Sequence, residues 1–307
     1  MILVAGGTGR LGSAVVDLLV ARGLPVRVLT RDRSRVRSRV GAQVEIVEGD
    51  VRDVAAVKRA VEGSDTVVSA IQGFAGSKGV NPASVDRDGN CNLIHAAAAA
   101  KVEHFVLTSV KDAGPTNSVE LMRMKYAAEQ ALRASGMPWT IIRPCVYMET
   151  WCEVLGRPLL DKGRTKVFGN GRNPINWVSM FDVARIIELA IVESAGRGEV
   201  IDVGGPEDLS MLQFVAEFQR GAGVSGKVGR IPPLAMRVSG VVMRVANPAM
   251  ARQIRAGIAM DREPMAFDAS AARERYPSVP STHLIDVVRR DFANVRGTDG
   301  APRPATR

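Results

Sequence analysis

Short apolar runs alternate along the first half of the chain with stretches whose apolar positions recur every three to four residues. The runs predict β-strands, and the periodic stretches predict amphipathic helices. The predicted strands are Ile2–Ala5, Val26–Leu29, Val44–Val47, Thr66–Ser69, His104–Thr108, Trp139–Ile142 and Val200–Val203. The predicted helices between them are Arg10–Arg22, Ala55–Glu62, Val85–Ala100 and Val119–Ser135. This order is typical of a Rossmann-type α/β fold, a doubly wound parallel sheet with helices on both faces.

The alternation weakens after Pro144, and the second half predicts a smaller, mainly helical region. Residues 151–176 are rich in Gly, Pro and Asn, so we expect a loop with one short helix there. Further helices are predicted at Phe181–Ser194, Met211–Gly221, Leu234–Val245 and His283–Phe292. We therefore divide the chain into a core over 1–150, a substrate-covering region over 151–296, from which 178–205 return to the core sheet, and a disordered tail over 297–307.

The junction between the first strand and the first helix is rich in glycine. Gly6 and Gly7 permit backbone angles that a Cβ would forbid, and Gly9 lets a phosphate approach the main chain. Gly12 lets the helix lie close to the sheet, and the free N–H groups at the helix start favour a pyrophosphate. Two glycine spacings fit, 7-9-12 and 6-9-12, so spacing does not choose between subclasses of dinucleotide site. The predicted contacts are Gly6, Gly7, Thr8, Gly9, Arg10, Leu11 and Gly12.

The end of the second strand is expected to lie beside the adenosine ribose. Thr30 and Arg31 stand there, where an NAD site usually places an acidic residue. Because a guanidinium suits a 2′-phosphate, this pair favours NADP(H) over NAD(H). The alternative is an exposed Arg31 with Asp32 binding the ribose. By the rule that ligands lie outside the carboxyl ends of strands, Asp50 and Val51 are expected near the adenine, and Ala70 and Ile71 near the adenosine ribose.

Several motifs together resemble the NmrA-like group of atypical short-chain dehydrogenases/reductases. They are Val4–Gly12, Gly49–Asp53, Phe105–Ser109, Lys125 with Glu129 and Leu132, Trp139–Pro144, and Asp202–Pro206. The likeness extends to about residue 210, and the last hundred residues match only loosely. It implies a nicotinamide cofactor and, in reductive members, a Ser together with a Tyr and a Lys four residues apart.

The Tyr-x-x-x-Lys pair is broken here, because Lys125 is preceded at position 121 by leucine. The resemblance to plant phenylpropanoid reductases of this group implies that Lys125 itself acts as the catalytic acid or base. Ser109, at the end of the fifth strand, and Tyr147, after the sixth, are the other catalytic candidates. The alternative is that Lys125 only binds the nicotinamide ribose and Ser109 only ends a strand.

Composition narrows the class of protein further. The chain has 307 residues, a formal charge of +9, 5% aromatic residues and three cysteines without a metal-site pattern. Five arginines alternate from Arg31 to Arg39, but no nucleic-acid-binding signature accompanies them, so we attribute the relevant charge to an anionic cofactor. No metal site, membrane insertion or signal peptide is expected, and the default location is cytoplasmic. The basic amphipathic segment 234–246 suits either packing within the protein or a membrane surface.

The sequence thus predicts an NADP(H)-dependent oxidoreductase that reduces a small organic acceptor by hydride transfer. Because the tyrosine at position 121 is missing, the alternative is a non-catalytic NADP(H)-binding redox sensor that acts through a protein partner. A homodimer is compatible with the sequence but not indicated by it.

Overall fold

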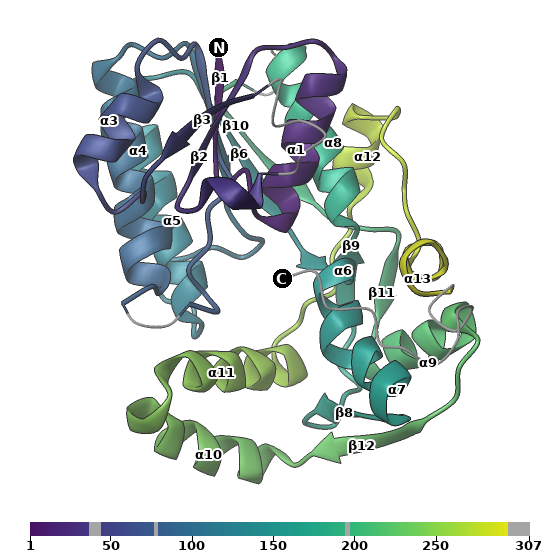
Figure 1. Ribbon diagram of the computed structural model, residues 1–307. Coiled ribbons are helices and arrows are strands. Elements are labelled where there is room, and N and C mark those ends of the chain that lie inside the picture. The colour runs from purple at the N-terminus through teal and green to yellow at the C-terminus, as the bar shows by residue number, and fades with distance from the viewer. Residues whose placement is uncertain (37–43, 77–78, 194–196, 294–307) are drawn as a thin grey trace.

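The protein is built around a seven-stranded parallel sheet, which confirms the predicted α/β class (Figure 1). The computed structural model describes residues 1–36, 44–76, 79–193 and 197–293. The strand order is β10–β6–β5–β4–β1–β2–β3. It reverses direction between β1 and β4, the point at which doubly wound sheets bind ligands. The strands are β1 Ile2–Ala5, β2 Val26–Thr30, β3 Val44–Glu48, β4 Thr66–Ser69, β5 His104–Thr108, β6 Trp139–Pro144 and β10 Glu199–Val203.

Helices cover both faces of this sheet (Figure 1). One layer contains α3 Val54–Val61, α4 Asp88–Ala99 and α5 Glu120–Arg133, and the other contains α1 Arg10–Ala21, α8 Met180–Val192 and α12 Ser270–Arg275. Each layer encloses its own apolar core against the sheet. In α1, for example, Val15, Val16 and Leu19 recur at helical spacing and are buried. The helix α8 and the strand β10 reach this unit from the second half of the chain.

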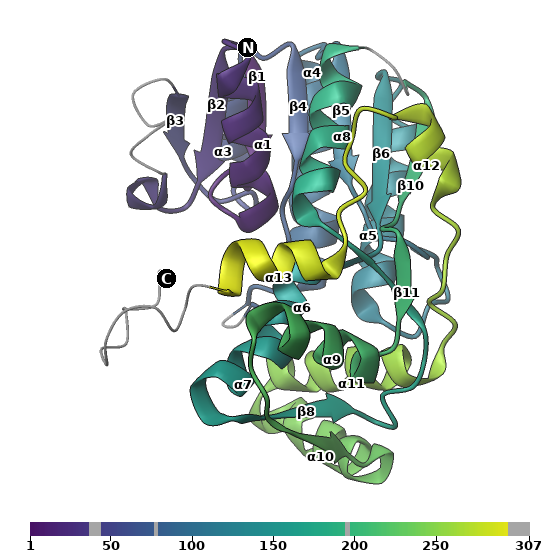
Figure 2. The same ribbon diagram turned by 90° about the vertical axis from the view of Figure 1, so that its right-hand side faces the viewer.

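The second unit lies beyond the carboxyl ends of the strands (Figure 2). Its core contains Trp177 and Phe214, whose ring centroids are 4.6 Å apart. Its strands are β7 Val146–Tyr147, β8 Arg164–Phe168, β9 Ile175–Val178, β11 Glu207–Leu209 and β12 Lys227–Ile231. Its helices are α6 Met148–Trp151, η3 Cys152–Gly156, α7 Arg157–Lys162, α9 Met211–Ala222, α10 Pro233–Ala246, α11 Pro248–Arg262 and α13 Leu284–Phe292.

Two expectations for the second half were wrong. Residues 151–176 do not form a loop with one short helix, because η3, α7 and β8 follow one another there and β9 begins at Ile175. Gly156 was one of the residues that predicted a loop. In the structure it allows close packing, because a Cβ on it would lie 2.2 Å from the Phe218 ring. The helix α11 was not predicted, although Asn247 caps it and Pro248 starts it. The tail at 297–307 lies outside the described residues.

The segment before α4 also differs from the prediction. The helix expected over Val85–Ala100 is preceded by a π-helical turn, η2 (Pro82–Arg87), that starts three residues earlier. Asn81 and Ser84 form a capping box at its start, which satisfies backbone N–H groups at the first turn. This turn places Asp86 on the inner side of the fold, where it is fully buried.

His104, at the start of β5, makes stability sensitive to acid. Burial lowers its pKa to about 4 from the ordinary 6.5, with a smaller contribution from Arg197. Because the pKa of His104 is lower in the folded protein than in the unfolded chain, its contribution to the free energy of unfolding is fully present above pH 6.5. This contribution is lost as the pH falls towards 4. The shift corresponds to about 3 kcal/mol. Urea unfolding across this range should therefore show a smaller loss in His104→Gln than in the wild type, and equal losses would contradict this role.

Candidate functional site

A cavity of about 390 Å³ lies at the carboxyl ends of the central strands. It collects residues from the ends of β1 to β5, from α5 and from the start of the second unit. Of the predicted site residues, those that line it are Gly6, Thr8, Gly9, Arg10, Leu11, Thr30, Arg31, Asp50, Val51, Ala70, Ile71, Ser109, Lys125 and Tyr147. The topology therefore brings together groups that are far apart in the sequence.

Gly7 and Gly12 do not line the cavity. A Cβ on Gly12 would lie 2.2 Å from the carbonyl oxygen of Gly6, so this glycine lets α1 approach the turn. A Cβ on Gly7 would lie 2.9 Å from a methyl group of Val28, so Gly7 serves packing. Of the pair Gly6 and Gly7, only Gly6 has a left-handed backbone, with φ +82°. The expectation of forbidden angles at both was therefore wrong for Gly7.

The turn after β1 has the features of an anion site. Gly9 is the N-cap of α1, no side chain caps the helix, and its first turn contains no acidic residue. The N–H groups of the first turn and the positive end of the helix dipole can therefore serve a phosphate. A Cβ on Gly6 would lie 2.7 Å from the carbonyl oxygen of Ala70, so a larger residue would disturb this turn. These features fit a pyrophosphate.

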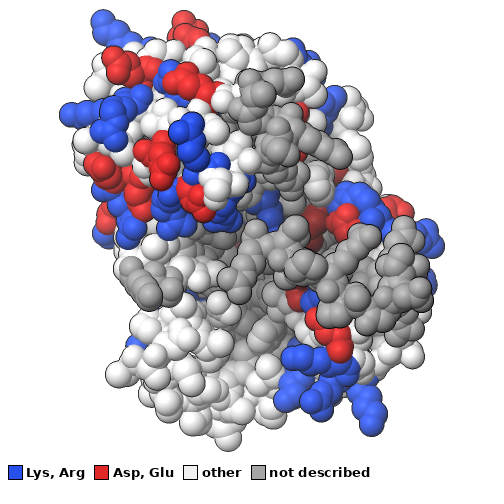
Figure 3. Space-filling model, viewed as in Figure 1, with Lys and Arg blue, Asp and Glu red and all other residues white. Residues whose placement is uncertain are grey.

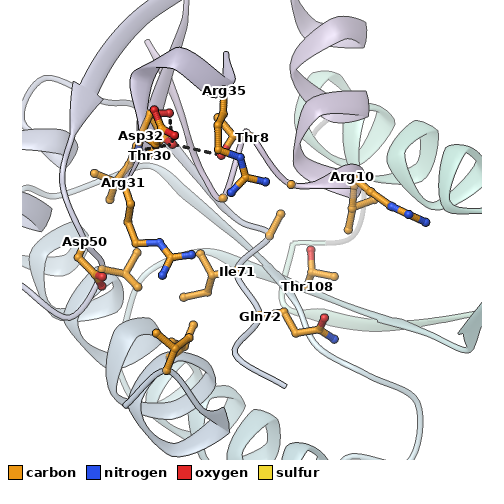
Figure 4. A pocket seen from close by; sticks show the side chains of 18 of the residues that line it. Thr8, Arg10, Thr30, Arg31, Asp32, Arg35, Asp50, Ile71, Gln72 and Thr108 are labelled. Atoms are coloured by element: carbon orange, nitrogen blue, oxygen red, sulfur yellow. Dashed lines mark hydrogen bonds between the residues drawn. The ribbon is translucent and has the colours of Figure 1, made fainter. Parts of the chain in front are cut away.

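Basic side chains surround the same space (Figure 4). Arg31 and Arg35 extend into the cavity from the side of Thr30, and Arg10 lies across from them. Arg35 was not predicted as a contact; the short helix η1 (Arg33–Arg35) returns it to the cavity. An arginine-rich run was the only signal for it. Arg37 and Arg39 lie outside the described residues.

Asp32, the alternative ribose ligand, also lines the cavity but already has local partners. The backbone N–H and the hydroxyl of Ser34 both donate to Asp32 Oδ1, at 3.0 and 2.5 Å. These hydrogen bonds, the side-chain one first, lower the pKa of Asp32. The carboxylate of Asp32 therefore caps η1. The neighbouring Thr30 Oγ1 lies 3.1 Å from Thr8 Oγ1, in the glycine turn after β1.

Asp50 is held at the end of β3 by a bidentate contact with Arg52. Arg52 Nε donates to Oδ1 at 2.9 Å and Nη2 to Oδ2 at 2.7 Å, and these bonds lower the pKa of Asp50. The carboxylate is thereby fixed in its ionised form beside Val51. This geometry leaves Asp50 at the cavity wall with its charge partly neutralised, and its place beside the adenine stays a prediction.

Lys125 lines the cavity and is buried. Its Nζ donates to the carbonyl oxygens of Ile71 and Thr108, at 3.0 and 2.9 Å, and lies 3.1 Å from Asp86 Oδ1. Burial raises the pKa of Asp86, and the Lys125 charge opposes that rise. Asp86 Oδ2 accepts the Gly73 N–H at 2.8 Å. The ammonium is therefore fixed at the ends of β4 and β5.

Asp86 is a site residue that the sequence analysis missed. No local spacing links it to Lys125, because the two lie on η2 and α5 and meet only through the contact between those helices. A π-helical turn inside a helix is frequent at functional sites, but it cannot be read from sequence periodicity.

Ser109 and Tyr147 differ in how their hydroxyl groups are engaged. Ser109 Oγ donates to Glu129 Oε1 at 2.5 Å, and the fully buried Glu129 is also paired with Arg143. The Ser109 proton is thus directed away from an acceptor in the cavity. The Tyr147 hydroxyl is buried with no hydrogen-bond partner among the described residues, and burial raises its pKa above the ordinary value. Tyr147 is therefore a protonated donor.

Leu121, in the position of the missing tyrosine, does not line the cavity. It packs with Val119 and Ala259, the latter on α11. The side chain one turn before Lys125 therefore contributes to contact between the two units.

Comparison with known proteins shows the family. Residues 6–185 match the family described as NAD(P)H-binding, and the chain belongs to it. It is 30% identical over 225 residues to the NAD(P)H azoreductase of Xenophilus azovorans, covering 73% of this chain and 74% of that protein. It is 26% identical over 237 residues to the photosystem II assembly factor Ycf39 of Trieres chinensis, covering 77% and 74%.

The solved structures agree on the fold. The NADPH-dependent quinone oxidoreductase of Escherichia coli, solved with NADPH, has a TM-score of 0.77 at 22% identity, covering 95% of this chain and 100% of that one. The family match thus confirms the NAD(P)H-binding domain that the resemblance to atypical short-chain dehydrogenases/reductases implied, and the solved structures confirm the fold. Within the described ranges, no helix has the length and apolar character needed to cross a membrane.

Proposed function

We propose that this protein is an NADP(H)-dependent oxidoreductase that reduces a small organic acceptor by hydride transfer. The main support is the distribution of groups in one cavity. Uncapped backbone amides, guanidinium groups, a buried ammonium and a phenol all border it. Membership of an NAD(P)H-binding family and the likeness to a named azoreductase support the same activity.

The chain offers a separate group for each part of the cofactor. The turn from Gly6 to Leu11 would hold the pyrophosphate, and Asp50 and Val51 would border the adenine. Lys125 would place its positive charge beside the nicotinamide ribose, because its three N–H groups already face the carbonyl oxygens of Ile71 and Thr108 and the carboxylate of Asp86. The bound nicotinamide would supply the hydride from its C4 atom. Since Nζ already donates to two carbonyl oxygens, a fixed positive charge is its main contribution, with proton donation second.

Arg31 is proposed to select NADP(H) by pairing with the 2′-phosphate, and Arg35 to assist it. Arg31→Gln should weaken NADPH binding by about tenfold or more, the value of a lost charge-assisted hydrogen bond, and leave NADH binding nearly unchanged. Fluorescence titration of both nucleotides measures this effect. Arg33→Gln is the matched control, because Arg33 lies on η1 but does not line the cavity. Equal losses for both nucleotides would remove the selecting role.

Tyr147 is proposed as the proton donor, because it lines the cavity and burial keeps its phenol protonated. Tyr147→Phe should lower kcat by about 100-fold, the usual contribution of general acid catalysis, with little change in unfolding because the hydroxyl has no hydrogen-bond partner in the described part of the chain. Ser109→Ala should instead destabilise the fold, since it leaves the buried Glu129 short of a donor. Steady-state kinetics combined with urea unfolding separates the two. If Tyr147→Phe keeps full turnover, Lys125 or solvent supplies the proton.

The acceptor is tested by following NADPH oxidation with carbonyl, quinone, enone and azo compounds. Turnover well above the rate without protein supports the oxidoreductase. Tight NADPH binding without turnover of any acceptor would contradict it.

The second candidate is a non-catalytic NADP(H) sensor that acts through a protein partner. The observation that favours it is Leu121, which removes the usual phenol and packs against α11. The likeness to a named assembly factor is compatible with it. Such a sensor would bind NADPH and NADP⁺ with different effects on partner affinity, and it would not consume NADPH.

A further inference from the structure

The helix α10 presents an apolar surface that faces away from the rest of the fold. Leu234, Val238, Val241, Val242 and Val245, which we call the α10 ridge, are all exposed, Val245 to 91% and Leu234 to 72%. At 100° per residue these five side chains form one stripe. Met236 and Gly240, on the other side of the helix, are buried where α10 packs on α11. The helix therefore has two apolar faces, and the described residues cover one of them.

The chain segment that contains the ridge carries charged residues of one sign. Residues 218–260 contain no aspartate or glutamate and seven basic residues, Arg220, Lys227, Arg230, Arg237, Arg244, Arg252 and Arg255. Arg237 and Arg244 lie on the same flank of the ridge, and the exposed Arg164 and Lys166 of β8 pair in register with β12. Figure 3 shows Lys and Arg gathered over β8 and β12, beside the largely uncharged surface over α10 and α11. The surface therefore complements an anionic partner.

The position of α10 suits a flat partner. In both ribbon views α10 lies at the outer end of the second unit, away from the central sheet (Figures 1 and 2). The ridge is convex and consists of Leu and Val, whereas protein interfaces favour aromatic anchors in pockets. Aliphatic residues on one face and arginines beside them are the pattern of a helix that lies in the plane of a bilayer interface.

We propose that the α10 ridge binds the surface of a membrane that carries anionic lipid headgroups. The ridge enters the boundary between headgroups and acyl chains, and Arg237, Arg244 and the basic residues of β12 pair with the headgroups. This contact is interfacial and crosses no bilayer, in keeping with the length of α10. A second copy of the chain is a poorer occupant, because it would bring an equally basic surface against this one. The cavity that we assign to the cofactor stays on the far side of the second unit.

Cosedimentation with lipid vesicles tests the proposal. Wild-type protein with NADPH is mixed with vesicles of phosphatidylcholine alone or with added phosphatidylglycerol, at low and high salt. We expect about tenfold stronger binding to the anionic vesicles at low salt, and less binding at high salt. The double substitution Val241→Gln with Val245→Gln should weaken the binding about tenfold or more, because two apolar side chains are no longer transferred from water into the membrane interface. Arg237→Gln with Arg244→Gln should reduce the salt dependence.

The control is Val54→Gln, which makes the same change at a half-exposed valine on α3 and should bind as the wild type does. NADPH titration of each variant shows that the fold is retained. Failure of the wild type to bind anionic vesicles would overturn the proposal, as would equal binding by the ridge variant. A wild type that is dimeric by light scattering, with a monomeric ridge variant and no vesicle binding, would assign the ridge to a second copy instead. None of these outcomes depends on turnover.

Discussion

Replacing Lys125 by methionine is expected to lower kcat by at least about 100-fold and the free energy of unfolding by about 3 to 5 kcal/mol. The kinetic loss follows from removing the fixed ammonium of Lys125 from the cavity wall. The loss of stability follows because Asp86, which is fully buried, would lose its ion-pair partner 3.1 Å away. Steady-state kinetics and urea unfolding of the same preparation measure both effects.

A second variant separates the two roles of Lys125. Lys125→Met combined with Asp86→Asn removes both charges, so it should recover most of the lost stability but none of the lost turnover. Asp86→Asn alone should keep the fold and lower kcat less than Lys125→Met, since the two carbonyl oxygens still hold Nζ. If Lys125→Met keeps its kcat with a genuine acceptor, the residue has no catalytic role.

Gly12→Ala is expected to weaken binding of NADPH by about 100-fold, the cost of displacing binding groups by about 1 Å. The new Cβ would lie 2.2 Å from the carbonyl oxygen of Gly6 and 2.9 Å from the Cα of Gly7, so the turn or α1 must move. Both contacts are with backbone atoms, which cannot rotate away as a flexible side chain can. Movement of either element would displace the amides that we assign to the pyrophosphate.

The matched control is Gly229→Ala, on β12. A Cβ there meets only ordinary van der Waals contacts, the nearest at 3.4 Å, and Gly229 does not line the cavity. Calorimetric titration with NADPH should therefore show wild-type affinity for Gly229→Ala and a large loss for Gly12→Ala. Retained affinity in Gly12→Ala would mean that the turn does not hold the pyrophosphate.

The central sheet could be predicted because its signals are local. In β1 a continuous apolar run ends at Gly6, and in β5 the apolar run from Phe105 to Leu107 ends at Thr108. The end of each strand can therefore be predicted from neighbouring residues alone. The rule that ligands lie at the carboxyl ends of strands then placed most lining residues correctly. Arg35 was not predicted as a lining residue, because its position depends on η1 and the arginine run does not indicate the direction of that turn.

The second unit was predicted less well because its elements depend on one another. The helix α11 is rich in polar and small residues, and it is stabilised mainly by its packing against α10. In η3, Gly156 indicates a loop in isolation, whereas its real constraint is the Phe218 ring on α9. Such contacts join segments far apart in the chain, so no window of sequence contains both partners.

The amino-acid sequence by itself determined the parallel sheet, the glycine turn and the absence of the usual tyrosine before Lys125, because each depends on neighbouring residues. Only the tertiary structure decided that Asp86 pairs with Lys125, that Glu129 accepts a hydrogen bond from Ser109 and that the Tyr147 hydroxyl has no hydrogen-bond partner within the described ranges. These contacts form where η2, α5 and the second unit meet. Their physical cause is burial, which makes charge pairing and hydrogen bonding strong only after the chain has folded.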